Sequence, residues 1–208
     1  MTPLKILGRA SSINVRKVLW TCVELGLAFE REERDWRSPE YLALNPNGMM
    51  PVLLEGPDFV LWESNTICRY LAGREGRDGR EDLLPAAPRA RALVERWMDW
   101  QATELNNSWR YAFMGLVRQS PAHQDAQQLQ AGVAGWNRHM QILEVQLRHA
   151  GAFVAGARFT LADIVIGLST HRWRAAPIER PDLPAVEAYY QRLLARPGFI
   201  THGRDAGP

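Results

Sequence analysis

Residues 45–67, NPNGMMPVLLEGPDFVLWESNTI, contain the pattern that decides the fold of the first part of the chain. The first four of these residues are turn formers. Residues 52–54 and Phe59–Trp62 are β-prone runs separated by Glu-Gly-Pro-Asp, so we predict a β-hairpin. Ser64 follows the second run and is a residue type that caps helices, so we predict a helix directly after the hairpin.

The residues before this stretch predict the rest of a domain that mixes strands and helices. Leu4–Leu7 is a short apolar run, as in a buried strand. Apolar residues within 15–22 recur at helical spacing, and Gly26 is placed to end that helix. A second strand is expected within residues 28–34 and a short helix over residues 39–44. The predicted order is β-α-β-α-β-β-α.

The second part of the chain has a helical pattern. Apolar residues at steps of three and four between residues 126 and 147 predict a long helix. Thr160 and Asp163 form a capping box, which marks the start of another helix. Residues 184–194 predict a final helix, and Pro197 is expected to stop it.

These patterns divide the chain into two predicted domains. Residues 73–88 are rich in Gly, Arg, Asp and Pro, which is typical of a linker. We therefore predict an α+β protein with a βαβαββα domain over residues 1–76, a linker over residues 77–88 and an all-α helical bundle over residues 89–208.

Composition excludes several classes of protein. The 208 residues include 25 basic and 23 acidic side chains without a run of like charge, so no nucleic-acid footprint or polybasic membrane anchor is expected. Cys22 and Cys68 are too far apart for a C-x-x-C pair, and two cysteines make neither a disulfide framework nor a metal quartet. The first five residues lack a signal-peptide apolar region, and no apolar stretch approaches the roughly 18 residues of a membrane span. We expect a soluble cytoplasmic protein without a metal, nucleic-acid or membrane partner.

Three segments with reactive or polar side chains lie at strand ends or helix starts, namely residues 8–16, 45–53 and 62–67. A single sheet would bring them together. In the first segment, the Ser11 and Ser12 hydroxyls lie at a helix N-terminus, where free N–H groups favour a bound anion. Simple helix capping uses the same residue types, and on this segment alone it outweighs a catalytic role.

The other two segments leave similar alternatives open. Pro51 forces Met50 into an extended conformation, and a cis bond between them would open the Met50 backbone to a ligand, although trans is the default. Ser64 could bind a carboxylate while Glu63 holds an adjacent ammonium, which fits the amino-acid end of a ligand. A serine cap with an acidic neighbour explains the same pair about as well.

The motifs taken together resemble the cytosolic glutathione S-transferase family over nearly the whole chain. They are Ser-x-x-x-Arg from residue 12, Asn-Pro-x-Gly-x-x-Pro-Val-Leu from residue 45, Glu-Ser-Asn-x-Ile-x-x-Tyr-Leu from residue 63, Thr-Leu-Ala-Asp from residue 160 and a late Arg-Pro. The pattern is most similar to bacterial serine-type members of theta, delta and beta-like character. The resemblance implies a thioredoxin-like N-terminal domain, a helical C-terminal domain, glutathione as co-substrate and a homodimer.

The resemblance also implies how the thiol is activated. The activating hydroxyl matches Ser12, four positions before Arg16, and Ser11 is the second candidate. A hydrogen bond from this hydroxyl to the glutathione sulfur would favour the thiolate and lower a thiol pKa that starts near 8.5. Asn14 could supply a second donor.

Other residues match the family's glutathione-binding positions. The resemblance implies a cis Pro51, backbone pairing of Met50 with the cysteinyl unit, and Glu63 and Ser64 at the γ-glutamyl end. Where related enzymes often have His or Gln for the glycyl carboxylate, this chain has Trp36 followed by Arg37. Either an indole N–H or a guanidinium could bind that carboxylate. The residues nominated for the electrophile pocket are Trp109, Arg110 and Phe113.

The leading hypothesis is an enzyme that activates the glutathione thiol for attack on a small hydrophobic electrophile. A non-catalytic glutathione-binding or protein-interaction module is an alternative, because fold alone does not imply function. A glutathione-dependent peroxidase or disulfide reductase is another alternative. For the homodimer, we expect the helix that begins at Ser64 and the helix that contains Leu93 to meet their symmetry mates.

Overall fold

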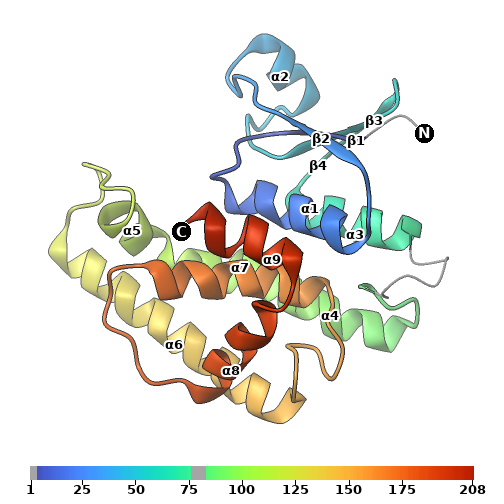
Figure 1. Ribbon diagram of the computed structural model, residues 1–208. Helices are drawn as coiled ribbons and strands as arrows, with labels where there is room; N and C mark the ends of the chain where they lie inside the picture. The colour runs from blue at the N-terminus through green and yellow to red at the C-terminus, as the bar shows by residue number, and fades with distance from the viewer. Residues whose placement is uncertain (1–3, 76–82) are drawn as a thin grey trace.

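The computed structural model describes residues 4–75 and 83–208, and Figure 1 shows its two parts. A four-stranded sheet in the order β2-β1-β3-β4 forms the first part. Strand β1 is parallel to β2 and antiparallel to β3, and β3 and β4 form the predicted hairpin. The elements in chain order are β1 (Leu4–Leu7), α1 (Ile13–Glu24), β2 (Phe29–Glu32), α2 (Pro39–Leu44), β3 (Val52–Glu55), β4 (Phe59–Trp62) and α3 (Ser64–Glu75). This order confirms the predicted βαβαββα arrangement.

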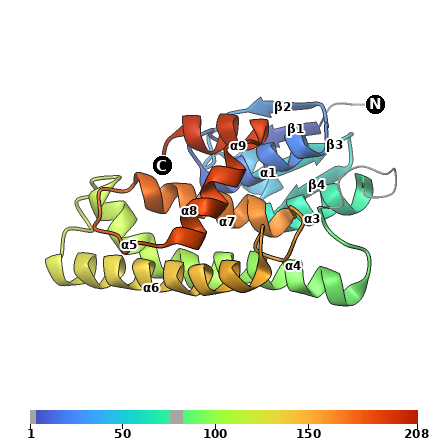
Figure 2. The ribbon, with the colours of Figure 1, turned by 60° about the horizontal axis from the view of Figure 1, so that its bottom comes forward.

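Helices make up the second part. They are α4 (Pro88–Trp100), a π-helical turn η1 (Gln101–Leu105), α5 (Asn106–Leu116), α6 (Ala126–Ala150), α7 (Leu161–Ala175), α8 (Pro184–Leu193), α9 (Pro197–His202) and a final short turn η2 (Arg204–Ala206). Figure 2 shows α6 along the outer side and α7 in the middle. Helix α9 lies beside the first part of the chain, β1 to α3, which we call the strand domain (Figure 2). Within the described ranges, no helix is both long enough and apolar enough to cross a membrane.

Two glycines set the ends of α1 and so position the loop that precedes it. Gly26 has φ +63° just after the helix, a left-handed conformation that glycine adopts at little cost, which confirms it as the helix stop. Gly8 has φ +152°, and a Cβ atom there would lie 2.5 Å from Val15. The loop between β1 and α1 therefore lies directly against the first turn of α1.

The two parts share one apolar core. Trp20 of α1 is fully buried, with its ring centroid 5.7 Å from that of Phe159 and 5.1 Å from that of Phe199. Helix α7 packs against α1 and α4, and all of its residues from Leu161 to Trp173 are buried. Burial of such large side chains fixes the helical part firmly against the strand domain.

Two local predictions need correction. Pro197 does not simply stop a helix, because it occupies the first turn of α9, where a missing N–H costs nothing. Ser64 is the first residue of α3, and Glu63 is its cap, since the Glu63 carbonyl accepts the first helical hydrogen bond, from Ile67.

Two further predictions concern the second part of the chain. The capping box is confirmed, with the Thr160 N–H 2.8 Å from the Asp163 carboxylate. Half of the predicted linker, residues 77–82, lies outside the described residues. The domain boundaries therefore remain a prediction.

Candidate functional site

The loop between β1 and α1 ends at Ser12, the residue that caps α1. Its backbone is extended (φ −82°, ψ 122°), as is usual at an N-cap, yet its side chain makes no capping hydrogen bond. The hydroxyl is half-buried and open to the adjacent cleft. Simple capping therefore does not account for the Ser12 side chain. Ser11 is more exposed than Ser12.

A cleft of about 640 Å³ lies between this loop and the helical part. Its strand wall, as we call it, consists of Arg9, Ser11, Ser12, Ile13 and Met49. Its helical wall consists of Trp109, Arg110, Phe113, Met114, Arg118, His123 and Arg172. The structure thus brings both predicted serines together with all three residues nominated for the electrophile pocket. Asn14 is half-buried on α1 and does not line the cleft.

The turn before β3 lies beside the strand wall. The Met50–Pro51 peptide bond is cis, as the resemblance implies. The Arg9 backbone N–H is 3.5 Å from the Met50 sulfur, so the turn contacts the loop that carries the serines. The Met49 carbonyl accepts hydrogen bonds from the Tyr41 hydroxyl at 2.9 Å and from the Asn45 side-chain amide at 2.8 Å. These two hydrogen bonds hold the turn in place.

Glu63 and Ser64 lie where β4 passes into α3. Glu63 has φ +72°, a conformation that non-glycine residues rarely adopt and that often marks a functional site. Its side chain is exposed, whereas Ser64 is buried. Burial lowers the pKa of Lys17 to about 8, and the Glu63 carboxylate is one of the groups that oppose this shift. Glu63 therefore acts electrostatically on α1, although neither Glu63 nor Ser64 lines the cleft.

Trp36 and Arg37 form a stacked pair between β2 and α2. The Arg37 guanidinium carbon lies 4.3 Å from the centroid of the Trp36 ring. Trp36 packs against a small buried cluster that includes Tyr41, and Arg37 is exposed. Both residues are outside the cleft that contains Ser12.

The helical wall combines aromatic rings with guanidinium groups. Trp109 and Phe113 are buried, and their ring centroids lie 5.3 Å apart in an edge-on arrangement. The Arg172 guanidinium lies over both rings, 4.1 Å from the Phe113 centroid and 5.0 Å from that of Trp109. Burial, together with the charges of Arg16 and Arg118, lowers the pKa of Arg172 to about 9.

Sequence reasoning missed Arg118 and Arg172 in this wall. Arg118 follows α5, and Arg172 lies much later, on α7. No short motif joins them to the serines, so only the fold brings them to the cleft. Arg172 lies in the last turn of α7, where basic residues are common because they complement the helix dipole, so its place along the chain carried no signal of a site.

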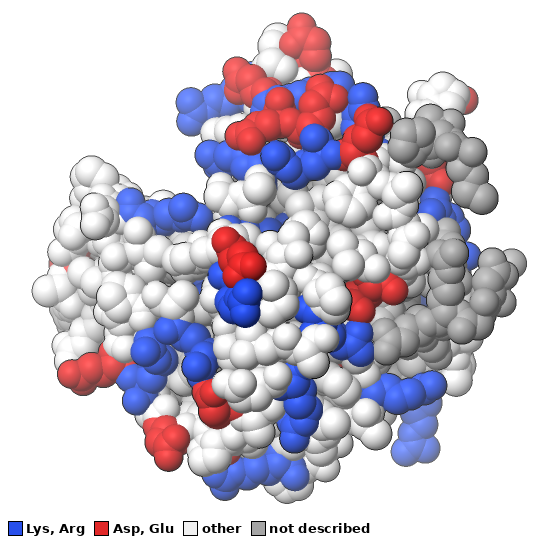
Figure 3. Space-filling model, in the orientation of Figure 1, with Lys and Arg blue, Asp and Glu red and all other residues white. Residues whose placement is uncertain are grey.

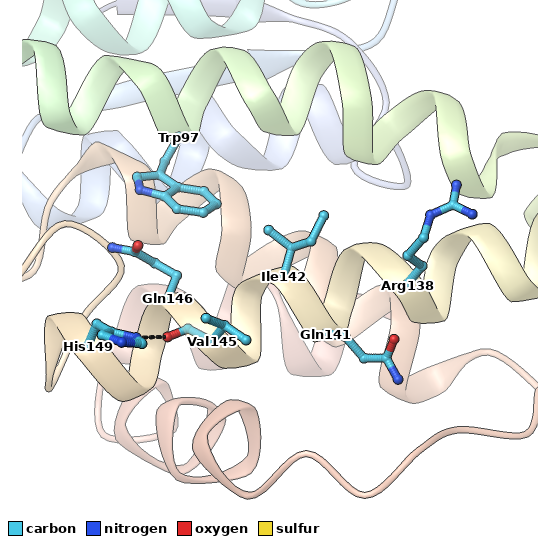
Figure 4. A pocket seen from close by; sticks show the side chains of 7 residues that line it. All are labelled: Trp97, Arg138, Gln141, Ile142, Val145, Gln146 and His149. Atoms are coloured by element: carbon cyan, nitrogen blue, oxygen red, sulfur yellow. Dashed lines mark hydrogen bonds between the residues drawn. The ribbon is translucent and has the colours of Figure 1, made fainter.

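A second cavity, of about 460 Å³, offers different chemistry. Figure 4 shows Trp97 of α4 above side chains that point from α6, including Ile142 and Val145. Its polar groups are amides, one histidine and Arg138, and none of the predicted site residues lines it. The cleft at Ser12 is therefore the stronger candidate for a reactive site.

Cysteine and metal chemistry have little support in the described part of the chain. Cys22 and Cys68 are free and buried. Burial raises the pKa of Cys22 to about 12 and that of Cys68 to about 11, so neither is a ready thiolate. Across residues 4–75 and 83–208, no three His, Cys, Asp or Glu side chains are grouped so that they could hold a metal ion.

Comparison with known proteins places this architecture in a family. The sequence-family model for the glutathione S-transferase N-terminal domain matches residues 11–74, and the family model for the C-terminal domain matches residues 126–192. Glutathione S-transferase GstB of Escherichia coli is 35% identical over 91% of this chain and 92% of its own length. Glutathione S-transferase 3 of Zea mays is 34% identical over 96% of this chain and 92% of its own length.

A solved structure agrees with the sequence relatives. The theta class glutathione S-transferase of Xanthomonas axonopodis pv. citri, crystallised with glutathione bound, superposes with a TM-score of 0.89. It is 38% identical, and the match covers 97% of each chain. By both sequence and architecture, the chain belongs to the glutathione S-transferase family.

Proposed function

We propose that this protein is a glutathione transferase in which Ser12 activates the thiol of glutathione. The observation that carries the proposal is the Ser12 hydroxyl, which sits at the cap of α1, makes no capping bond and lines the cleft. A free hydroxyl there can donate a hydrogen bond to a sulfur in the cleft. Such a bond favours the thiolate over the thiol, because hydrogen bonds to a charged acceptor are stronger.

Glutathione would lie along the strand domain with its sulfur at Ser12. The Met50 backbone next to the cis Pro51 would pair with its cysteinyl unit, and Glu63 and Ser64 would bind the γ-glutamyl end. The unusual backbone of Glu63 supports this assignment, since it presents an exposed carboxylate at the start of α3. Trp36 or Arg37 would bind the glycyl carboxylate.

The reaction joins the thiolate sulfur to an electrophilic carbon. The thiol first gives its proton to solvent. The sulfur then forms a C–S bond, and a leaving group such as chloride departs with the electron pair of the bond that breaks. Arg9 in the strand wall adds positive charge to the cleft, which further favours an anionic sulfur. The cleft supplies proximity by holding both reactants together.

The electrophile would bind against the helical wall, and it would be small and largely hydrophobic. The rings of Trp109 and Phe113 form an apolar face opposite the serines, and Arg110 lies at the same wall. A cavity of about 640 Å³ is within the range that accommodates small organic ligands.

The protein would act as a cytoplasmic homodimer. Apolar side chains that are unusually exposed support a subunit interface, and they include Phe59, Val60 and Trp62 on β4 and Leu93 on α4. The two free cysteines suit a reducing compartment. Size-exclusion chromatography with light scattering at several concentrations would show twice the chain mass of 23.6 kDa, and a single 23.6 kDa species would contradict the dimer.

The test compares Ser12→Ala with Ser11→Ala as its matched control. With a chlorodinitrobenzene and glutathione, Ser12→Ala should lose most of the kcat/KM while Ser11→Ala keeps it. Unchanged kcat/KM in Ser12→Ala would refute the assigned role. Calorimetry without detectable glutathione binding at millimolar ligand would favour a non-catalytic module. Reduction of cumene hydroperoxide without turnover of aryl halides would favour a peroxidase.

A further inference from the structure

Four arginines surround the cleft without a carboxylate to neutralise them. Arg9, Arg110, Arg118 and Arg172 line it with His123, and no Asp or Glu is among its lining residues. Within the described residues, none of the four forms a salt bridge. In Figure 3, a basic group lies over α5, and basic and acidic side chains are mixed over the strand domain. The cleft is therefore strongly cationic although the net charge of the whole chain is only +2.

Arg172 is the most unusual of the four. It is only 5% exposed, and its Nε atom is buried without a hydrogen-bond partner. Arg16 makes a matched contrast, because it is equally buried but donates to the carbonyls of Ala10, Ala206 and Gly207. A buried guanidinium whose donors are unpaired costs free energy, so such groups are normally paired.

The surroundings of Arg172 leave its charge unmatched. One side of the guanidinium rests on the rings of Phe113 and Trp109, which attract a cation but accept no conventional hydrogen bond. Burial together with the charges of Arg16 and Arg118 lowers its pKa to about 9. An anion bound in the cleft would give the Arg172 guanidinium a hydrogen-bond acceptor and would relieve the repulsion between the arginines.

We propose that the electrophile carries a carboxylate, which Arg172 binds with support from Arg118 while its apolar body rests against the helical wall. A planar carboxylate matches the two parallel donors that a guanidinium presents. The carboxylates of glutathione are assigned elsewhere, because Trp36, Arg37 and Ser64 lie outside this cleft. This inference rests on the proposed function, since it names the substrate class of the same site.

The test uses two electrophiles that differ in charge only, a chlorodinitrobenzoate and its chlorodinitrobenzamide. In both, the glutathione sulfur forms the C–S bond and chloride leaves with the C–Cl electron pair, while the thiol proton goes to solvent. Each kcat/KM is divided by the rate of the uncatalysed reaction. The protein should prefer the benzoate by about 10-fold or more, as expected for a charge-assisted pair.

Variants test whether the arginines cause the preference for the benzoate. Arg172→Met should lower kcat/KM for the benzoate about 10-fold more than for the benzamide, because one charge-assisted pair is lost. Arg118→Met changes an exposed position and should weaken the same preference. It replaces Arg172→Met as the test variant if Arg172→Met does not fold. Arg174→Met is the control, since Arg174 is on the same helix but pairs with Glu187 outside the cleft.

The outcomes separate this inference from the proposed function. Turnover of both electrophiles without preference for the benzoate would overturn the carboxylate assignment and leave the transferase intact. Failure to turn over either electrophile would contradict the transferase itself. A weaker glutathione affinity in Arg172→Met, measured by calorimetry, would also overturn the inference, because it would assign the guanidinium to glutathione.

Discussion

Apart from Met49, the strand wall of the cleft is built from one short loop, residues 9–13, whereas the helical wall joins residues 109–123 to Arg172 much later in the chain. Ser11, Ser12 and Ile13 follow one another at the start of α1. In the other wall, Phe113 comes from α5 and Arg172 from α7. The first wall offers hydroxyls and backbone groups, and the second offers rings and positive charge. This difference suggests that one wall performs the chemistry and the other selects the electrophile.

The largest expected effect tests whether the strand wall acts on every electrophile alike. Ser12→Ala should lower kcat/KM about 100-fold, because removing one donor to a developing or stabilised anion costs that much or more. The loss should be equal for the chlorodinitrobenzoate and the chlorodinitrobenzamide, so their rate ratio stays constant. A loss confined to one electrophile would place Ser12 in selection instead.

The next largest effect concerns a buried contact between the strand domain and the helical part. Gln101 of the π-helical turn accepts a hydrogen bond from buried Lys17 of α1 at 2.7 Å and donates to Ser169 of α7 at 2.9 Å. Gln101→Leu removes the nearest hydrogen-bond acceptor of the Lys17 ammonium, so the free energy of unfolding should fall by about 2 kcal/mol. Denaturant unfolding would measure it, with exposed Gln141→Leu as control. Equal stability of both variants would contradict this role.

A smaller effect tests the helical wall by itself. Phe113→Leu preserves most of the packing but removes the ring under Arg172. The KM for the electrophile should rise by roughly 3- to 10-fold with an unchanged Kd for glutathione. Phe153→Leu, outside the cleft, provides the control. A changed glutathione Kd would show that the two walls do not divide their work as proposed.

The last prediction concerns pH and the residue next to Arg172. Burial, together with the charges of Arg16, Arg174 and Arg172, lowers the pKa of His171 to about 4, against an opposing effect of Asp205. The folded state thus resists protonation, and stability from neutral His171 is present above the unfolded pKa near 6.5. As pH falls from 6.5 towards 4, the protein should lose on the order of 1 kcal/mol per pH unit relative to His171→Gln.

Urea unfolding of both proteins at several pH values would measure that difference. Comparison with the variant cancels other titrating groups, including Asp163, whose pKa burial raises to about 6. A stability difference that does not change with pH would mean that His171 titrates alike in the folded and unfolded states.

The contrast between the walls also explains how far the sequence could predict the site. The order of strands and helices along the chain, the capping box at Thr160 and the serines at the start of α1 follow from local patterns, which short segments carry. Arg172 and Arg118 reach the cleft through packing of α7 and α5, so no spacing rule identifies them. The predicted cap of α3, Ser64, lies one residue after the observed cap, because Glu63 adopts a conformation that local propensity disfavours.

The most direct test of the account measures the ionisation of glutathione bound in the cleft. Thiolate absorbance in the ultraviolet, followed against pH, gives the thiol pKa in the complex with the wild-type protein and with Ser12→Ala. We predict a bound pKa well below the value near 8.5 of a free thiol, and a return of about one to two units towards that value in Ser12→Ala. The same lowered pKa in both proteins would contradict activation by Ser12.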